Sequence, residues 1–293
     1  MSVPQVPSRT VLVTGCSSGI GAATALVLRE AGWQVFPTAR KPADLDALRG
    51  AGFAPLAMDV ADPASVETAV RDLLAQTGGS LGALVNNAGF CQAGAMEDVS
   101  RDALRAQFEV NLFGPHQLTR ALLPVFRGQG CGRIVNISSV FGRISAPMVG
   151  SYCASKFALE AISDALRIEL RNTGVWVALV EPGAILSRFR RNAAEALDRS
   201  IDRTRSGFGE VYAHEIERRR RQIKKADFFT RPPEVVARKI LHALESPRPR
   251  RRYLVTLPAH LAEWAVRFIP QAWTDPLLAR RVPERRPRPE GPR

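Results

Sequence analysis

Short apolar runs rich in β-branched residues alternate with longer helical patterns through the first 180 residues of this chain. The runs are almost continuously apolar, as expected for strands that are covered on both faces. Strand–helix–strand units of this kind connect parallel strands by right-handed crossovers. The alternation therefore predicts an α/β fold, with a doubly wound, mostly parallel, seven-stranded sheet and helices on both faces. Six strands are predicted in this part, at residues 10–14, 34–38, 54–58, 83–86, 133–138 and 175–180. The helical patterns between them cover residues 19–31, 43–50, 63–76, 101–127 and 150–171.

The pattern becomes irregular after residue 180. Residues 184–230 are predicted to be a partly helical insertion that forms a lid over a substrate. A helix then begins after Pro232 and runs to about residue 245, and residues 253–256 form a seventh strand. No linker or repeat divides the chain, so residues 1–279 are predicted as a single domain. The Pro/Arg-rich residues 280–293 are predicted to be a basic, disordered tail.

The net charge of +13 is unevenly distributed. Residues 188–225 hold 12 Lys/Arg and 6 Asp/Glu, residues 247–293 hold 11 and 4, and the remaining residues hold 18 of each. Basic segments can bind nucleic acid or anionic membrane, although they are more often solvated surface. We expect no nucleic-acid partner, and peripheral membrane contact through the basic tail stays an open alternative.

The other compositional features indicate a cytoplasmic protein. No run of 18 apolar residues is present, and the N-terminal residues lack the apolar region of a secretory signal. The four cysteines have no spacing typical of a disulfide framework or a metal site. We expect reduced thiols and no bound metal.

A glycine-rich stretch, Thr14-Gly-Cys-Ser-Ser-Gly-Ile-Gly21, lies between the first predicted strand and helix. Gly15 permits a tight turn, Gly19 a close backbone approach, and Gly21 the packing of the helix on the sheet. The helix N-terminus then offers free N–H groups to a pyrophosphate. Because a strand precedes the glycines and a helix follows, the stretch predicts a Rossmann-type dinucleotide site. The predicted contacts are Gly15, Ser17, Ser18, Gly19, Ile20 and Gly21.

The end of the second strand bears on which dinucleotide is bound. An acid there binds the ribose 2′-hydroxyl of NAD, whereas an arginine accommodates the 2′-phosphate of NADP. This chain has Arg40 and Lys41 there and no acid before Asp44. The guanidinium fork of arginine suits a phosphate, so we predict NADP(H) in preference to NAD. Two surface cations that merely follow a strand are the alternative.

Tyr152 and Lys156 are four residues apart on a predicted helix and therefore share one face. A tyrosine has an ordinary pKa of about 10, and a neighbouring ammonium lowers that pKa toward a useful range. Any amphipathic helix can carry such a pair, so the pair alone indicates little. Ser139, thirteen positions before Tyr152, offers a hydroxyl for a substrate oxygen. Ser138 is the alternative candidate for the same role.

Together these motifs resemble the short-chain dehydrogenase/reductase family in its one-domain form. The resemblance covers residues 10–187 and rests on four blocks: residues 14–21, Asn86-Asn-Ala-Gly89, Asn111, and Ser139 with Tyr152 and Lys156. The glycine stretch and the Arg40 position look like those of the hydroxysteroid and retinol dehydrogenase branch.

The resemblance implies a role for each matched residue. Tyr152 would be the general acid/base, and Lys156 would lower its pKa and bind the nicotinamide ribose. Ser139 would hold the substrate oxygen, and Asn111 would support the water of a proton relay. The cofactor would also contact Asp59, Val60, Asn87, Ala88, Gly89, Pro182, Gly183, Ile185 and Ser187. Ser187 stands where the family usually has threonine.

The sequence therefore predicts an NADP(H)-dependent oxidoreductase that interconverts a secondary alcohol and a ketone. A bulky, apolar, steroid- or retinoid-like substrate is indicated by eight apolar residues of the insertion: Ile185, Leu186, Phe189, Phe208, Val211, Tyr212, Phe228 and Phe229. The resemblance also implies a homodimer or homotetramer built through residues 101–127 and 150–171. The alternative is a catalytically weak protein that senses or binds NADP(H) and uses its basic segments on nucleic acid or membrane.

Overall fold

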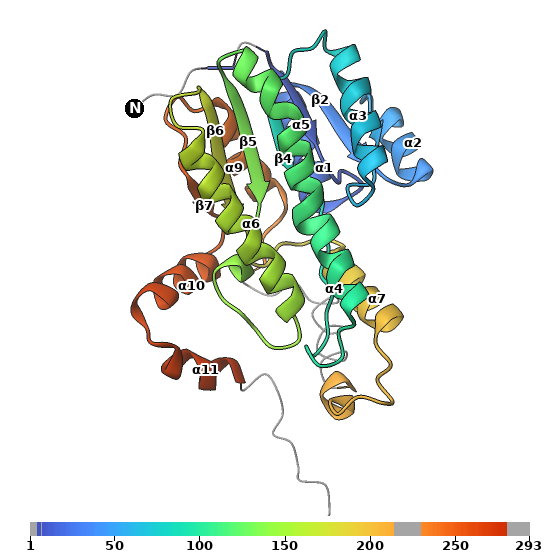
Figure 1. Cartoon of the computed structure of the whole chain (residues 1–293), viewed down its shortest axis with the longest axis vertical. Coiled ribbons are helices and arrows are strands. Elements are labelled where there is room, and N and C mark those ends of the chain that lie inside the picture. Colours follow the sequence, from blue (N-terminus) through green and yellow to red (C-terminus); the bar gives the residue numbers. More distant parts are fainter. Residues whose placement is uncertain (1–4, 7, 214–229, 280–293) are drawn as a thin grey trace, which may run out of the picture.

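Seven parallel strands form one sheet in the order β3-β2-β1-β4-β5-β6-β7 (Figure 1). The computed structural model describes residues 5–6, 8–213 and 230–279. Within this part, every strand pairing is parallel, where the sequence predicted a mostly parallel sheet. The predicted doubly wound α/β fold is confirmed. The strands are β1 (Thr10–Val13), β2 (Gln34–Ala39), β3 (Leu56–Ala57), β4 (Ala83–Asn86), β5 (Gly132–Ile137), β6 (Val175–Glu181) and β7 (Arg252–Leu254).

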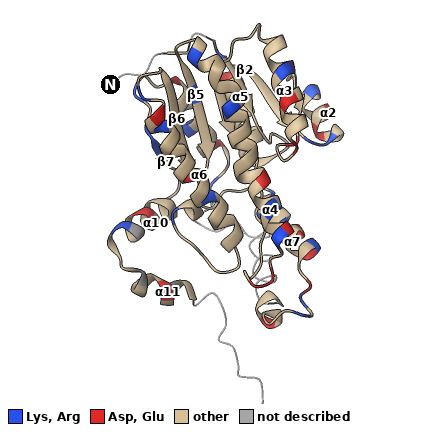
Figure 2. Cartoon of the chain, viewed as in Figure 1, with Lys and Arg blue, Asp and Glu red and all other residues tan. Residues whose placement is uncertain are grey.

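Helices cover both faces of this sheet and its carboxyl edge. One face is covered by α1 (Gly19–Glu30), α2 (Pro42–Gly50) and α9 (Glu234–Glu245), and the other by α3 (Pro63–Gln76), α5 (Gly114–Gly128) and α6 (Gly150–Glu169). Beyond the carboxyl ends of the strands lie α4 (Arg101–Phe108), α7 (Phe189–Ser200), α10 (Leu257–Phe268) and α11 (Gln271–Ala279) (Figure 1). Charged residues of both signs are interspersed on outer helices such as α2, α3 and α7 (Figure 2). Among the described helices, none is both long and apolar enough to span a bilayer.

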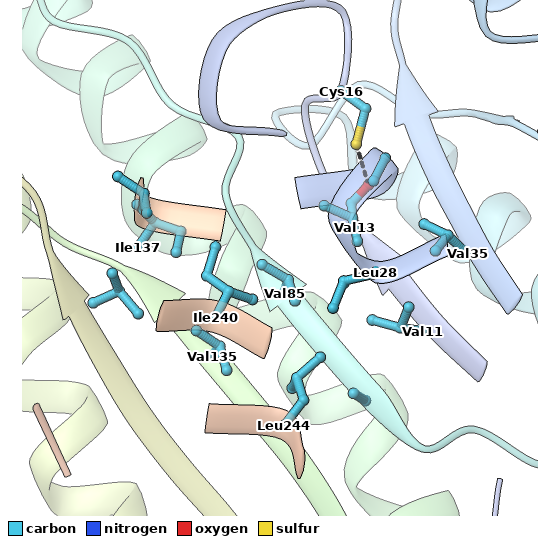
Figure 3. Packing of buried hydrophobic residues seen from close by; sticks show 14 of the residues in the cluster. Val11, Val13, Cys16, Leu28, Val35, Val85, Val135, Ile137, Ile240 and Leu244 are labelled. Carbon is cyan, nitrogen blue, oxygen red and sulfur yellow. Dashed lines mark hydrogen bonds between the residues drawn. The ribbon is translucent and has the colours of Figure 1, made fainter. Parts of the chain in front are cut away.

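Alternation along the strands divides the core into two layers. On β1, Val11 and Val13 pack toward α1 and α9, whereas Leu12 packs toward α3 and α5. Successive strand side chains point to opposite faces, so a buried central strand must be apolar at every position. Figure 3 shows the first layer, where Ile240 and Leu244 of α9 lie against the strand valines. Burial of one such side chain contributes about 1.5–3 kcal/mol.

The sequence predicted one continuous helix at residues 101–127, and its continuity is wrong. The structure has α4, a π-helical turn η1 (Glu109–Phe113), and then α5. Gly114 packs so closely on the loop after β3 that a Cβ there would lie 2.2 Å from the carbonyl oxygen of Val60. The amide of Asn111 inside η1 is bonded to the loop after β4. These tertiary contacts, which periodicity does not encode, account for the change of helical winding.

Other predicted boundaries shift by a few residues. The third predicted strand contracts to Leu56–Ala57. The helix predicted at residues 150–171 is α6, which ends at Glu169. The seventh strand is Arg252–Leu254, not residues 253–256, because Thr256 is the N-cap of α10. The two amphipathic stretches near the C-terminus are the helices α10 and α11.

Candidate active site

The strand order reverses between β1 and β4, so the connections leaving these strands diverge at the carboxyl edge of the sheet. Parallel sheets bind ligands in the crevice that this divergence creates. The structure brings the predicted site residues to this edge. Most of them lie in the loops that follow β1, β2, β3, β4, β5 and β6; Gly19–Gly21 form the first turn of α1, Asn111 lies in η1, and Tyr152 and Lys156 lie on α6.

The glycine stretch is shaped by direct backbone contact. Gly15 and Gly19 have φ angles of +72° and +61°, in the left-handed region that favours glycine. A Cβ on Gly15 would lie 2.8 Å from the Cα of Ala88, and a Cβ on Gly21 would lie 2.2 Å from the oxygen of Gly15. Gly15 and Gly21 therefore leave no room for a side chain, but Gly21 packs against Gly15 and Asn87 and not, as the sequence had predicted, against the sheet.

Thr14 and Asn87 lock the two loops together. The hydroxyl of Thr14 accepts hydrogen bonds from the backbone N–H groups of Asn87 and Ala88, both at 2.9 Å. In return, the side-chain amide of Asn87 donates to the carbonyls of Thr14 at 2.8 Å and Gly15 at 3.1 Å. Thr14 was assigned no role from the sequence. Its signal was a hydroxyl at the last position before the first glycine.

The N-terminus of α1 fits an anionic group. Ser18 is its N-cap, yet the Ser18 side chain makes no capping hydrogen bond. Ser17 beside it is exposed, and Ile20 is half-buried. Free N–H groups and the positive end of the helix dipole are therefore directed to the crevice, where a pyrophosphate would bind.

Arg40 and Asp59, which were predicted to contact different parts of the cofactor, form an ion pair. The guanidinium Nη1 lies 3.3 Å from the Asp59 carboxylate, and the two side chains are 65% and 33% exposed. An exposed pair contributes only about 0–1 kcal/mol, so Arg40 remains free to meet a phosphate. Lys41 is exposed at the start of α2, whereas Val60 is buried.

The loop after β6 touches the glycine stretch. A Cβ on Gly19 would lie 3.0 Å from the Cβ of Ser187, which places Ser187 directly over the turn. Pro182 accepts a hydrogen bond from the N–H of Val140 at 3.0 Å. Gly183 leaves no room for a side chain, because a Cβ there would lie 2.2 Å from the Thr256 hydroxyl.

Ile185 is buried where this loop continues toward the insertion. It forms an isolated parallel bridge with Arg231, which follows residues 214–229 in the sequence. The two ends of the insertion are therefore paired at the carboxyl edge.

Ser139 and Tyr152 meet at the centre of this edge. Ser139 begins the 3-10 turn η2 (Val140–Gly142), and its hydroxyl accepts a hydrogen bond from the N–H of Phe141 at 3.2 Å. A side-chain hydrogen bond joins Ser139 to Tyr152. Ser138, the competing serine, lies instead beside Glu160. The structure thus places Ser139, not Ser138, next to the phenol.

Burial raises the pKa of Tyr152, and the hydrogen bond with Ser139 opposes this rise. The sequence led us to expect a pKa lowered by Lys156, and the structure differs. The rings of Phe141 and Phe189 cover Tyr152 edge-on, with centroids 6.3 and 5.4 Å away, so the phenol is only 7% exposed. Loss of solvent penalises the phenolate more than the neighbouring charge supports it.

Lys156 is buried beside Tyr152. Its ammonium lies 5.8 Å from the centroid of the Tyr152 ring and donates a hydrogen bond to the carbonyl of Ile137 at 2.8 Å. Burial lowers the pKa of Lys156 to about 8, and the carboxylate of Glu160 acts in the opposite direction. The protonation state of Lys156 therefore depends on the charges of the groups close to it.

Asn111 joins the loop after β4 to α6. Its side-chain amide exchanges hydrogen bonds with the backbone of Phe90 at 3.1 Å in both directions and donates to the hydroxyl of Ser155, also at 3.1 Å. Ser155 directly precedes Lys156. A Cβ on Gly89 would lie 3.2 Å from the Asn111 oxygen, so the loop passes closely over this amide.

An apolar cluster covers the phenol of Tyr152. It includes Leu197, Val211 and Tyr212 from the insertion, with Phe189 at its edge. The hydroxyl of Tyr212 donates to Asp98 at 2.7 Å and accepts from the N–H of Ala95 at 2.8 Å. These bonds anchor the insertion to the loop after β4. Phe228 and Phe229, also predicted to face the substrate, lie outside the described residues.

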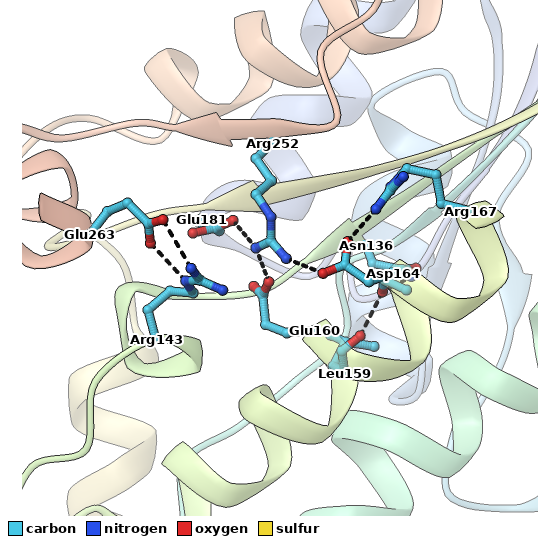
Figure 4. A network of polar contacts seen from close by, with 10 residues as sticks. Asn136, Arg143, Leu159, Glu160, Asp164, Arg167, Glu181, Arg252 and Glu263 are labelled. Carbon is cyan, nitrogen blue, oxygen red and sulfur yellow. Dashed lines mark hydrogen bonds and ion pairs between the residues drawn. The ribbon is translucent and has the colours of Figure 1, made fainter. Parts of the chain in front are cut away.

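A buried ionic network behind Lys156 was missed by the sequence reasoning. Arg252 contacts the carboxylates of Glu160, Glu181 and Asp164, at 2.7 Å for Glu181 and 2.5 Å for Asp164 (Figure 4). A second pair, Arg143–Glu263, lies beside it, with two hydrogen bonds of 2.7 and 2.9 Å. Glu160 and Asp164 continue the four-residue spacing of Tyr152 and Lys156 along α6, and that spacing was the available signal.

Comparisons with known proteins agree with this geometry. The family model described as short chain dehydrogenase matches residues 9–198. The chain is 41% identical over 278 residues to the uncharacterized oxidoreductase YbbO of Escherichia coli, covering 94% of this chain and 95% of that one. It is 32% identical over 290 residues to human retinol dehydrogenase 5, covering 94% and 89% of the two chains.

A solved structure is similar along nearly the whole chain. It is a short chain dehydrogenase/reductase from Burkholderia phymatum in complex with NAD, with a TM-score of 0.76 and 26% identity. The alignment covers 97% of this chain and 99% of the other. On these grounds the chain belongs to the short-chain dehydrogenase/reductase family of NAD(P)-dependent oxidoreductases.

Proposed function

We propose that this protein is an NADP(H)-dependent oxidoreductase that interconverts a secondary alcohol and a ketone, with Tyr152 as acid/base. One observation carries the proposal: the Ser139 hydroxyl, the Tyr152 phenol and the buried Lys156 ammonium lie together where β5 ends. The apolar cluster of the insertion covers them. This arrangement offers a proton and a hydrogen bond to one substrate oxygen in a place from which water is excluded.

Each polar group of the set has a distinct task in this mechanism. When bound, the nicotinamide cofactor supplies or accepts the hydride. Ser139 orients the substrate oxygen, and Tyr152 gives its phenolic proton to that oxygen in reduction or takes it back in oxidation. The raised pKa of Tyr152 keeps the proton on the phenol at neutral pH. Lys156 places positive charge beside the phenolate that forms, and Asn111 fixes the helix that carries both residues.

The preference for NADP(H) rests on Arg40 and Lys41. Both side chains are exposed at the carboxyl end of β2, and the acid in reach, Asp59, is paired with Arg40. A 2′-phosphate would replace this weak pair with a charge-assisted, bidentate contact. The ribose 2′-hydroxyl of NAD would find no free carboxylate at the same place.

A bulky apolar substrate, steroid- or retinoid-like, is supported by the cluster over Tyr152. Its inner surface is formed by aliphatic and aromatic side chains, with Phe189 touching the phenol ring. The described part of the predicted insertion, residues 184–213 and 230, forms the lid in this proposal, and residues 214–229 lie outside the described residues. The likeness to a retinol dehydrogenase fits this class of substrate.

Association with a second copy is supported by apolar residues left exposed on η1 and α6. Phe113, Phe157 and Ile168 are 50%, 42% and 64% exposed. In a homodimer or homotetramer, these residues would be covered by the same helices of another copy. Sedimentation of wild type and an Ile168→Glu variant tests this: a monomeric wild type contradicts it.

Peripheral membrane contact is a second proposal, supported by α10. Leu257, Leu261, Trp264 and Phe268 share one face of this helix and are 57–63% exposed. The Arg-rich residues 280–293 follow α11 in the sequence. Twelve residues are too few to span a bilayer, so the face would lie in an anionic surface. Cosedimentation with phosphatidylglycerol vesicles, lost in Trp264→Ala, tests this; equal binding to phosphatidylcholine contradicts the anionic preference.

The function is tested by turnover of NADPH and NADP over a panel of ketones and secondary alcohols. Tyr152→Phe is expected to lower kcat by about 10²- to 10⁴-fold, because the proton donor is removed while the ring remains. Cofactor affinity is expected to stay within twofold to threefold. Tyr253→Phe is the matched control, since Tyr253 is equally buried but lies on β7 and bonds to His242 of α9 and to the backbone N–H of Arg250. Unchanged kcat in Tyr152→Phe contradicts the mechanism, and cofactor binding without turnover favours the binding-protein alternative.

A further inference from the structure

Four polar side chains lie on one face of α6 at intervals of four residues: Tyr152, Lys156, Glu160 and Asp164. Tyr152 and Lys156 point to the proposed catalytic centre, and Glu160 lies one turn behind Lys156. Glu160 is only 4% exposed. A carboxylate so far from water is costly unless charged groups or hydrogen bonds hold it.

Arg252 supplies that support and ties together three elements. Its Nη1 contacts both Glu160 and the fully buried Glu181, and its Nη2 contacts Asp164 (Figure 4). Glu181 is the last residue of β6, and Pro182 of the proposed nicotinamide-side loop follows it directly. The guanidinium therefore links α6 to the start of that loop.

Glu160 also packs against the turn that carries Ser139. A Cβ on Gly142 of η2 would lie 3.0 Å from the Cγ of Glu160 and 2.7 Å from the Ser138 hydroxyl. The N–H of Val140 in the same turn donates to the carbonyl of Pro182. The serine turn, the catalytic helix and the loop after β6 thus converge on one carboxylate.

The electrostatic surroundings of Lys156 single out Glu160. Burial lowers the pKa of Lys156 to about 8, and Glu160 is the group whose charge raises it. The other titratable or charged groups on the packed elements are Cys91 after β4, Arg143 after η2, Tyr152, Cys153 and Asp164 on α6, Glu181 on β6 and Arg252 on β7. Arg252 contacts both Glu160 and Glu181, but only Glu160 lies on α6, one turn from the ammonium.

We propose that Glu160 is a positioning residue for the acid/base pair: its carboxylate, held by Arg252, keeps Lys156 charged and fixes the Tyr152–Lys156 face of α6 against the Pro182 loop. The proposal rests on the proposed function for the roles of Tyr152 and Lys156. It adds a residue that touches neither substrate nor cofactor and acts through Lys156.

The test is the pH dependence of kcat/KM, measured with saturating NADPH in the full chain from pH 6 to 10. In Glu160→Gln, Lys156 loses its negative neighbour, so its ammonium gives up the proton at lower pH. The alkaline fall in activity is expected to begin about one pH unit lower, which corresponds to a tenfold change in the proton affinity of Lys156. A merely structural role would lower activity by the same factor at every pH.

Two variants separate charge from packing. Glu160→Asp keeps the charge and is expected to restore at least half of the shift. Asp164→Asn is the matched control, because Asp164 contacts the same guanidinium one turn farther from Lys156, and its side chain is 38% exposed. It is expected to leave the alkaline limb in place. If Glu160→Gln does not fold, Glu160→Met fills the same volume without charge and carries the same expectation.

A second readout does not require turnover. The ¹³C chemical shift of the Lys156 ε-carbon, assigned with a Lys156→Arg variant, gives the proton affinity of Lys156 directly. A lower proton affinity of Lys156 in Glu160→Gln, but not in Asp164→Asn, supports the proposal. This holds even if the wild type turns over no substrate and the proposed function fails. An unchanged Lys156 titration in Glu160→Gln, or an equal shift in Glu160→Asp, overturns it.

Discussion

The cofactor side and the substrate side of the site are built in different ways. On the cofactor side, backbone meets backbone: a Cβ on Gly15 or Gly21 would collide with backbone atoms of the loops around it. On the substrate side, side chains meet side chains, as where Phe189 covers Tyr152. The first contacts have no freedom to adjust, whereas side chains can change rotamer and repack.

This difference indicates where the protein tolerates change. A contact made by backbone atoms is the same for every dinucleotide, so the cofactor side recognises a shared chemical group. A surface of side chains can be exchanged residue by residue without moving a strand. We therefore expect substitutions on the cofactor side to weaken cofactor binding and those on the substrate side to change which substrate is accepted.

The largest effect on cofactor affinity is expected for Gly21→Ala. The new Cβ would lie 2.2 Å from the Gly15 oxygen and 2.5 Å from the Asn87 amide nitrogen, so the turn must move. Overpacking of this kind costs about 1–3 kcal/mol, which corresponds to a loss of roughly 5- to 150-fold in cofactor affinity. Titration of the protein with NADPH by calorimetry measures it.

Gly50→Ala is the matched control for this prediction. Gly50 is also helical, at the end of α2, but a Cβ there meets nothing within 4 Å. The variant is expected to bind NADPH as the wild type does and to unfold at the same or a slightly higher temperature. If both alanine variants bind the cofactor normally, the cradle is not formed by backbone contact.

A smaller effect, of a different kind, is expected for Phe189→Ala in the insertion. Removal of the ring uncovers Tyr152 and opens space on the substrate side. We expect kcat/KM for bulky apolar ketones to fall by roughly tenfold, about 1.4 kcal/mol, with cofactor affinity unchanged. Phe53→Ala is the control, because Phe53 packs on the sheet far from α6. A loss of NADPH affinity in Phe189→Ala would contradict the separation of the two sides.

The cofactor side was predictable because its signals are local in sequence. The strand, the glycines and the helix of residues 10–31 are consecutive, and each glycine has a steric reason that holds in any such turn. The alternation of apolar runs fixed the strands for the same reason, since parity along a strand decides which face a side chain covers. Thr14 escaped because its partners, Asn87 and Ala88, are more than 70 residues away.

The surroundings of Tyr152 were less predictable because they depend on tertiary packing. Spacing placed Lys156 next to Tyr152, but it gave no measure of how deeply Phe141 and Phe189 bury the phenol. The expected fall in the pKa of Tyr152 was therefore wrong for this conformation. Arg252 reaches Glu160 across 92 residues of sequence, so no local pattern announced that pair.

An effect no larger than that of Phe189→Ala is expected for Arg40→Ala, which tests the comparison at the solvent-exposed rim of the cofactor side. At this rim a side chain, not the backbone, recognises the cofactor. We therefore expect a partial loss of affinity that differs between NADPH and NADH. Loss of the guanidinium is expected to weaken the binding of NADPH by about tenfold and that of NADH by less than twofold, since only NADPH carries the 2′-phosphate.

Arg49→Ala is the control for this prediction. It removes a comparable exposed arginine, paired with Asp46 at 2.7 Å, and should change neither affinity. Equal weakening of both dinucleotides by Arg40→Ala would mean that Arg40 acts through general positive charge, and Lys41 would then share that role. Selective weakening of NADPH would show that side-chain recognition on this protein extends from the substrate side to the rim of the cofactor side, leaving backbone contact to hold the pyrophosphate alone.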